Sequence, residues 1–133
     1  MKYLLDTNSL SKNIINKASK RSDVFIIRDV LDEYVYSPEE EAKFKSTGID
    51  VIDLKQKHFE KLSDVMKKHG SNFSLIRLYT GKGTADVLIL AYILAETEVQ
   101  DTLFPEEYTI VTQDGELISV AKEYGINCIN QFL

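Results

Sequence analysis

The amino-acid sequence predicts a single α/β domain, with a parallel sheet of about five strands flanked by helices on both faces. First, short β-rich runs alternate with helically periodic segments along the whole chain, and strands separated by helices form parallel sheets. Second, the chain has 133 residues, the length of one domain with a sizeable core. Third, there are no repeats, linkers or low-complexity stretches, so a single domain is expected to cover residues 1–133.

Five short runs have the composition of strands. Each is rich in apolar or β-branched residues and is bounded by polar residues, which is the pattern of a strand within a sheet. They cover residues 2–5, 23–27, 48–54, 108–112 and 127–129.

Helix signals fill the intervals between these strands. Ser37-Pro38 followed by three glutamates predicts a helix start, because serine caps, proline suits the first position and acids favour the first turn. A second helix is expected from a cap at Thr84 to about Thr97; it is apolar nearly all round and is therefore expected to be buried. Other helices are predicted around Val30–Val35, around Phe59–Met66 with a stop at Gly70, and around Leu117–Tyr124 with a stop at Gly125.

Composition and charge indicate a cytoplasmic protein. The chain has one cysteine, Cys128, which cannot form an internal disulfide, and its longest apolar run, residues 87–95, is too short to cross a bilayer. Asp6 interrupts any N-terminal apolar segment, so no signal peptide is expected. The net charge is −5, but residues 10–28 carry five basic side chains and one acid. That stretch is either a phosphate-facing patch or a solvated helix face.

Four acidic residues stand where a strand ends or on a helix: Asp6, Glu33, Asp86 and Asp114. Asp6 and Asp114 follow predicted strands, and the carboxyl ends of parallel strands form the ligand-binding edge of such a sheet. Carboxylates held close together repel one another and stay ionised only beside a cation. Carboxylate oxygens are the ligands that Mg²⁺ and Mn²⁺ prefer. The pattern therefore indicates metal-dependent chemistry on a phosphodiester.

Each of these acids also has a structural interpretation. Asp6 and Asp114 are suitable helix caps, and Asp86 lies in a first turn, where the helix dipole favours an acid. Glu33 lies on a short helix as an ordinary solvated charge would, and the neighbouring Asp32 competes with it for any role.

Other motifs do not support a different chemistry. Gly81-Lys82-Gly83-Thr84 lacks the spacing of a P-loop, although its amides and Lys82 could touch a phosphate. His58 and His69 have no second metal-binding partner in the sequence, and we interpret both as surface residues.

Taken together, the acidic segments resemble those of the PIN-domain nuclease family over nearly the whole chain. The third segment is the most specific of the four. In order, the segments are Leu4-Leu5-Asp6-Thr7-Asn8, Val30-Leu31-Asp32-Glu33, Gly83-Thr84-Ala85-Asp86-Val87-Leu88-Ile89-Leu90-Ala91 and Ile110-Val111-Thr112-Gln113-Asp114-Gly115-Glu116-Leu117.

The resemblance implies a PIN-like fold and a Mg²⁺- or Mn²⁺-dependent endonuclease that cleaves RNA. It implies that the catalytic and metal-binding acids are Asp6, Glu33, Asp86 and Asp114. It further implies polar support from Thr7, Asn8 and Thr112, with Glu116 as a candidate fifth carboxylate. Small PIN proteins are often VapC-type toxins of toxin–antitoxin pairs and often homodimers, so an antitoxin partner and a dimer are expectations. A stand-alone RNA-processing ribonuclease fits the same residues.

Two rival functions remain open. One is a catalytically silent member of the same fold that acts as an RNA- or protein-interaction module, although the intact set of acids speaks against it. The other is a phosphatase of the haloacid-dehalogenase type, which also opens with an aspartate after a strand. That chemistry requires a second aspartate two positions further on, where this chain has Asn8.

Overall fold

The structure, a computed structural model, describes residues 1–68, 85–98 and 105–132, which form one α/β domain around a parallel sheet. Its five strands, all parallel, are β1 (Lys2–Leu5), β2 (Val24–Ile27), β3 (Asp50–Ile52), β4 (Tyr108–Val111) and β5 (Asn127–Ile129). The helices in the described residues are η1 (Thr7–Ser9), α1 (Lys12–Ser19), α2 (Arg28–Tyr34), α3 (Pro38–Lys45), α4 (Gln56–Lys68), α6 (Ala85–Glu98) and α7 (Gly115–Glu123). The predicted fold class is confirmed, and the architecture is consistent with a PIN-like fold.

The strand order β3-β2-β1-β4-β5 places the first strand at the centre of the sheet. From β1 the chain builds outward through β2 to β3, then returns to lay β4 against the other side of β1. The connections that leave β1 and β4 therefore run in opposite directions. Such a switch point opens a crevice at the carboxyl ends of the two strands, and ligands of open α/β sheets bind there.

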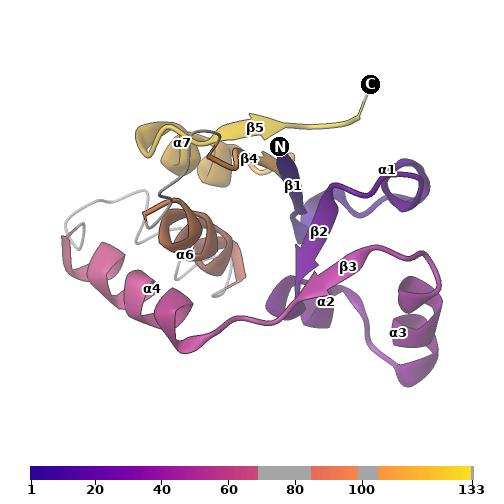
Figure 1. Cartoon of the computed structure of the whole chain (residues 1–133). Helices are drawn as coiled ribbons and strands as arrows, with labels where there is room; N and C mark the ends of the chain where they lie inside the picture. The colour runs from indigo at the N-terminus through magenta and orange to yellow at the C-terminus, as the bar shows by residue number, and fades with distance from the viewer. Residues whose placement is uncertain (69–84, 99–104, 133) are drawn as a thin grey trace.

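Helices cover both faces of the sheet, as predicted. Figure 1 shows α4 and α6 on one side and α1 and α3 on the other. The division fits the rule that crossovers between parallel strands are right-handed, because the chain reverses its direction across the sheet between β3 and β4. No helix among the described residues is long and apolar enough to span a membrane.

The predicted helix ends inside the described residues are confirmed. Ser37 caps α3, since its hydroxyl accepts the Glu40 N–H at 3.2 Å. Gly125 ends α7 at a φ of +72°, a backbone conformation that glycine adopts without strain. The expected cap at Thr84 and the expected stop at Gly70 lie outside the described residues.

Helix α6 is buried on nearly all sides and forms the centre of the core, as its composition predicts. The third strand is shorter than predicted. Gly48 takes a φ of +79° in the turn after α3, and Asp53 leaves the sheet to form an ion pair with Arg28 at 3.4 Å. Only residues 50–52 of the predicted 48–54 therefore pair with β2.

Candidate active site

Asp6 lies at the carboxyl end of β1, at the switch point of the sheet. Its side chain is buried, with the residue only 2% exposed. Oδ1 accepts the backbone N–H of Thr7 at 2.8 Å, and Oδ2 accepts the hydroxyl of Thr112 at 2.7 Å. The two oxygens are thus held from both strands of the switch point, which fixes the orientation of the carboxylate. Asp6 also serves as the N-cap of η1, so the structural and functional interpretations are compatible.

Asp86 comes to Asp6 from the first turn of α6 and is 5% exposed. Desolvation by burial, followed by the charge of Asp6 and a hydrogen bond between the two carboxyl groups, raises the pKa of Asp86 to about 8. The charges of Asp114 and Glu33 act in the same direction. Without a cation, these interactions favour the protonated form of the Asp86 carboxyl at neutral pH.

Glu33 on α2 joins the site through Thr7. The Thr7 hydroxyl donates to Glu33 Oε2 at 3.1 Å, so one threonine contacts both acids. Partial burial of the Glu33 carboxyl raises its pKa; the Thr7 hydrogen bond opposes this, while the charges of Asp6 and Asp29 add to it. Glu33 and the neighbouring Asp32 are both exposed at the level of the whole residue. The structure thus brings Glu33 into hydrogen-bonding contact with the Asp6 loop.

Asp114 approaches the site from the turn after β4 and also caps α7. Its Oδ1 accepts the N–H groups of Glu116 at 2.9 Å and of Leu117 at 3.4 Å. The capping interpretation is therefore confirmed, and the charge of Asp114 still contributes to the raised pKa of Asp86. Glu116 contributes a backbone N–H to this cap.

Thr112 connects the loops that follow β1 and β4 through its side-chain hydrogen bonds. Its fully buried hydroxyl lies 2.7 Å from Asp6 Oδ2 and 3.2 Å from Asn8 Oδ1, and it accepts the Asp114 N–H at 3.0 Å. Asn8 Oδ1 also accepts the Gln113 N–H at 3.0 Å. Two of the predicted supporting residues therefore hold the acids in place by linking chain segments about a hundred residues apart.

Replacement of Thr112 by valine is expected to destabilise the protein by about 2 kcal/mol, because Asp6 Oδ2 and the Asp114 N–H would lose their buried partner. Thr112→Ser keeps the hydroxyl and is expected to cost less than about 1 kcal/mol, the value of one methyl group. Urea unfolding at neutral pH compares the two. A loss of stability in Thr112→Ser as large as that in Thr112→Val would show that the methyl group contributes as much as the hydroxyl, and would contradict this prediction.

The oxygen-only donor set suits Mg²⁺ or Mn²⁺. In the described residues, no three acidic, histidine or cysteine side chains stand close enough together to hold a metal ion as a ready-made cage. Mg²⁺ does not require such a cage, because proteins usually bind it through one or two carboxylates while it keeps several waters. The buried pair Asp6–Asp86 therefore fits as direct ligands, with Glu33 and Asp114 near enough to act by charge.

The basic stretch of residues 10–28 is largely used for structural contacts. Arg21 forms two hydrogen bonds with Asp23, at 2.9 and 3.0 Å, and stacks on the ring of Phe132. Lys17 donates to the Phe132 carbonyl at 3.2 Å, and Arg28 pairs with two acids. These three cations hold the C-terminal segment and α2 in place. For Lys12 and Lys20, the choice between a phosphate-facing patch and a solvated helix face stays a prediction.

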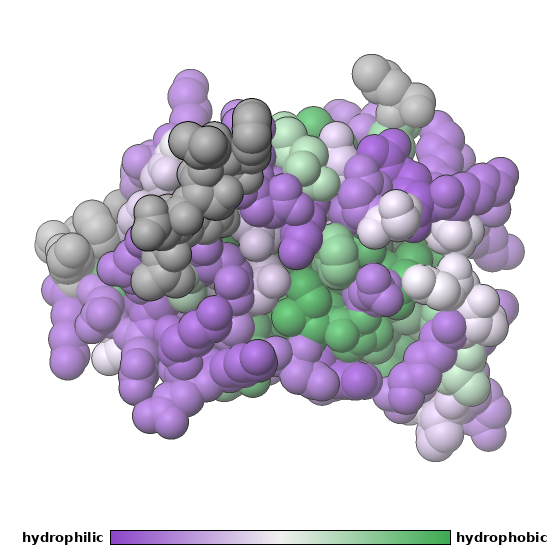
Figure 2. All heavy atoms as spheres, in the orientation of Figure 1, coloured by the Kyte–Doolittle hydropathy of each residue, from purple (hydrophilic) through white to green (hydrophobic). Residues whose placement is uncertain are grey.

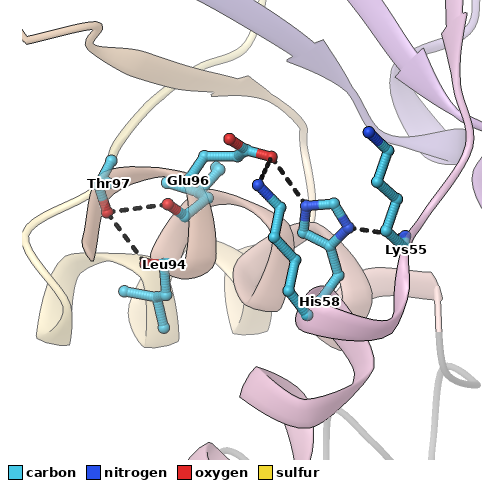
Figure 3. Close-up of polar contacts among 7 residues, drawn as sticks. Lys55, His58, Leu94, Glu96 and Thr97 are labelled. Carbon is cyan, nitrogen blue, oxygen red and sulfur yellow. Dashed lines mark hydrogen bonds and ion pairs between the residues drawn. The ribbon is translucent and has the colours of Figure 1, made fainter. Parts of the chain in front are cut away.

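The interpretation of His58 as a surface residue is wrong. His58 is 2% exposed, and its Nδ1 accepts the Lys55 N–H at 2.8 Å while Nε2 lies 2.9 Å from Glu96 Oε1 (Figure 3). The ring therefore caps α4 and ties it to α6. Its position three residues after the N-cap, where a glutamate often makes the same contact, is the sequence signal that could have indicated this role. His69 lies outside the described residues.

The geometry defines a class of site: a carboxylate pair buried at the switch point of a parallel α/β sheet, supported by hydroxyl groups. Comparison with known protein families finds no family model that matches this chain. Comparison with curated proteins likewise finds no match.

Proposed function

We propose that the protein is a metal-dependent endoribonuclease that hydrolyses phosphodiester bonds of RNA with Mg²⁺ or Mn²⁺. The observation that carries this proposal is the buried carboxyl pair of Asp6 and Asp86 at the switch point of the sheet. A buried pair of like-charged groups is unfavourable unless a proton or a cation neutralises it. The resemblance of all four acidic segments to PIN-domain nucleases supports the same function.

Each residue has a defined part in this proposal. Asp6 and Asp86 are the direct ligands, and Asp86 must release its proton when a cation binds. Thr112 and Thr7 hold the two oxygens of Asp6 in fixed directions, as residues around a metal ligand commonly do. Glu33 adds negative charge and is oriented by the Thr7 hydroxyl.

A divalent cation in this position would supply a nucleophilic water at neutral pH and would offset the charge that develops on the phosphate. The protein contributes the fixed ligands and a site that is shielded from solvent. Because the acids are negative, a phosphodiester would be repelled until a cation is bound. Cation and substrate binding are therefore expected to be coupled.

A cytoplasmic location, a toxin–antitoxin role of the VapC type and a homodimer are finer proposals that rest on the resemblance. The single Cys128 suits a reducing compartment. A stand-alone RNA-processing ribonuclease would use the same acids.

The direct test incubates the purified protein with a pool of structured and single-stranded RNAs in Mn²⁺, Mg²⁺ or EDTA. We expect cleavage with either metal and none in EDTA. Binding of Mn²⁺, measured by calorimetry, separates two explanations of a negative result. Metal binding without cleavage would indicate an enzyme restricted to a particular RNA, whereas neither binding nor cleavage would contradict the proposal.

An interaction module of the same fold is the second candidate. The observation that favours it is that no three metal-binding side chains of the described residues are assembled together. Such a module would bind RNA or protein with the same affinity in EDTA and in Mg²⁺.

A further inference from the structure

A groove lies between α1 and α3, on the face of the sheet away from α6. It has a volume of about 720 Å³, and Tyr34 and Phe44 contribute aromatic rings to its lining. The two rings meet edge to face, with centroids 6.3 Å apart. Phe44 is buried, whereas Tyr34 remains half exposed. Figure 2 shows hydrophobic atoms in a hollow on this side, ringed by hydrophilic residues.

The rim of the groove is polar and carries two lysines. Lys12 on α1 and Lys43 on α3 are both exposed, and neither has an ion-pair partner among residues 1–68, 85–98 and 105–132. Asn16 adds an exposed amide. Glu40 is the acidic residue that lines the groove, and its Oε2 accepts a hydrogen bond from the Tyr36 N–H at 3.2 Å.

One end of the groove is tied by short chain segments to the acids. Tyr34 directly follows Glu33, and Lys12 lies five residues after Thr7. Glu33 and Thr7 are the pair that meets at the active site with a 3.1 Å hydrogen bond. A chain seated in the groove could therefore continue toward the carboxylates.

We propose that this groove binds a single-stranded segment of RNA that flanks the cleaved bond, an inference that rests on the proposed function. A half-exposed aromatic ring beside basic side chains is the combination that holds single strands, by base stacking and phosphate contacts. Lys12 and Lys43 contact phosphates, the Asn16 amide contacts a base or ribose, and Tyr34 stacks on a base. An apolar helix would fit less well, because it would bury both ammonium groups and the amide without partners.

The test measures fluorescence anisotropy of a labelled oligouridine with the full-length protein in EDTA and again with Ca²⁺, so that binding is read without cleavage. Lys43→Gln is expected to weaken binding several-fold and to reduce the slope of log affinity against log salt by about 0.7, the value of one phosphate contact. Tyr34→Leu, which keeps an apolar side chain against Phe44, is expected to weaken binding about tenfold. Lys122→Gln, an exposed lysine on α7, is the matched control and should change neither quantity.

The outcomes distinguish a failure of the proposed RNA-binding groove from a failure of the proposed nuclease function. Weaker binding by both groove variants supports the groove, whether or not the wild-type protein cleaves RNA. If both variants keep the affinity and the salt slope of the wild type and still cleave RNA, the proposed RNA-binding role of the groove is wrong and the proposed nuclease function is unaffected. The groove would then suit a protein segment. Failure of the wild-type protein to bind the oligonucleotide in either condition also overturns it. Thermal melts confirm that each variant is folded.

Discussion

Asp6→Asn and Asp86→Asn are each expected to lower metal-dependent RNA cleavage by at least about 100-fold, because a divalent cation contributes several kcal/mol to stabilising the transition state. Both side chains are buried and contact each other, so loss of either carboxylate removes half of the direct ligand pair. The measurement is the initial rate of cleavage at saturating Mn²⁺. Loss of activity should be accompanied by weaker Mn²⁺ binding in calorimetry.

The neighbouring acids of α2 provide a matched control. Both acids are exposed, but Glu33 accepts the Thr7 hydroxyl and its charge acts on Asp86. Glu33→Gln is therefore expected to reduce cleavage. Asp32→Asn should leave the rate within about twofold of wild type, because its charge is screened by solvent and it has no such contact with the Asp6 loop. A larger loss of cleavage in Asp32→Asn than in Glu33→Gln would assign Asp32, instead of Glu33, to the site. Full activity in both Asp6→Asn and Asp86→Asn would rule out these residues as the metal site.

The second large effect concerns stability in the absence of metal. The pKa of Asp86 is raised to about 8 in the folded protein, whereas an ordinary aspartate has a pKa of 3.8. Between these values the folded protein keeps a proton that the unfolded chain has released. The free energy of unfolding is therefore expected to fall as pH rises from about 4 to about 8, by a few kcal/mol, and this contribution is constant outside that window.

Asp86→Asn removes this dependence, because asparagine is neutral at every pH in the window. In EDTA at pH 8 the variant is expected to melt at least about 5 °C above the wild type, and at pH 4 the two should converge. Asp64→Asn, an exposed acid on α4, is the control for the loss of a charge. Added Mg²⁺ should stabilise the wild type at pH 8 and have little effect on Asp86→Asn. If the free energies of unfolding of the wild type and of Asp86→Asn changed with pH in parallel, Asp86 would be ionised in the folded protein without metal.

These two experiments also distinguish the enzyme from an interaction module. A module with the same buried pair would show the pH-dependent stability but no cleavage and no metal-linked change in RNA binding. An enzyme should show all three effects, and the same substitution, Asp86→Asn, should remove each of them. The Thr112→Val variant separates positioning from ligation, because it disturbs the orientation of Asp6 while leaving every carboxylate in place.

The predicted supporting residues differ in how far local sequence could define them. Thr7 and Asn8 follow Asp6 directly, so their proximity to that acid is a local property. The contact of Asn8 with Gln113 and the contact of Thr7 with Glu33 are not local, because they depend on how β1, β4 and α2 come together. Sequence patterns identify the residues, whereas the sheet order decides which of them meet.

The sequence by itself determined the order of strands and helices and the positions at which acidic residues follow them. Strand composition, the Ser37-Pro38 start and the Gly125 stop are local signals, since each depends on backbone conformation within a few residues. These signals were sufficient for the parallel α/β class and for the position of Asp6 at the functional edge.

The tertiary structure alone decided the pairing of Asp6 with Asp86, the choice of Glu33 over Asp32 as the acid that touches the Asp6 loop, and the burial of His58. Each depends on packing between elements that are distant in the chain, for which a short segment carries no signal. A carboxyl group is buried, and its pKa raised, when other elements remove water from around it and bring further negative charges close to it. That is why the four acids are visible in the sequence, while their electrostatics become apparent only in the fold.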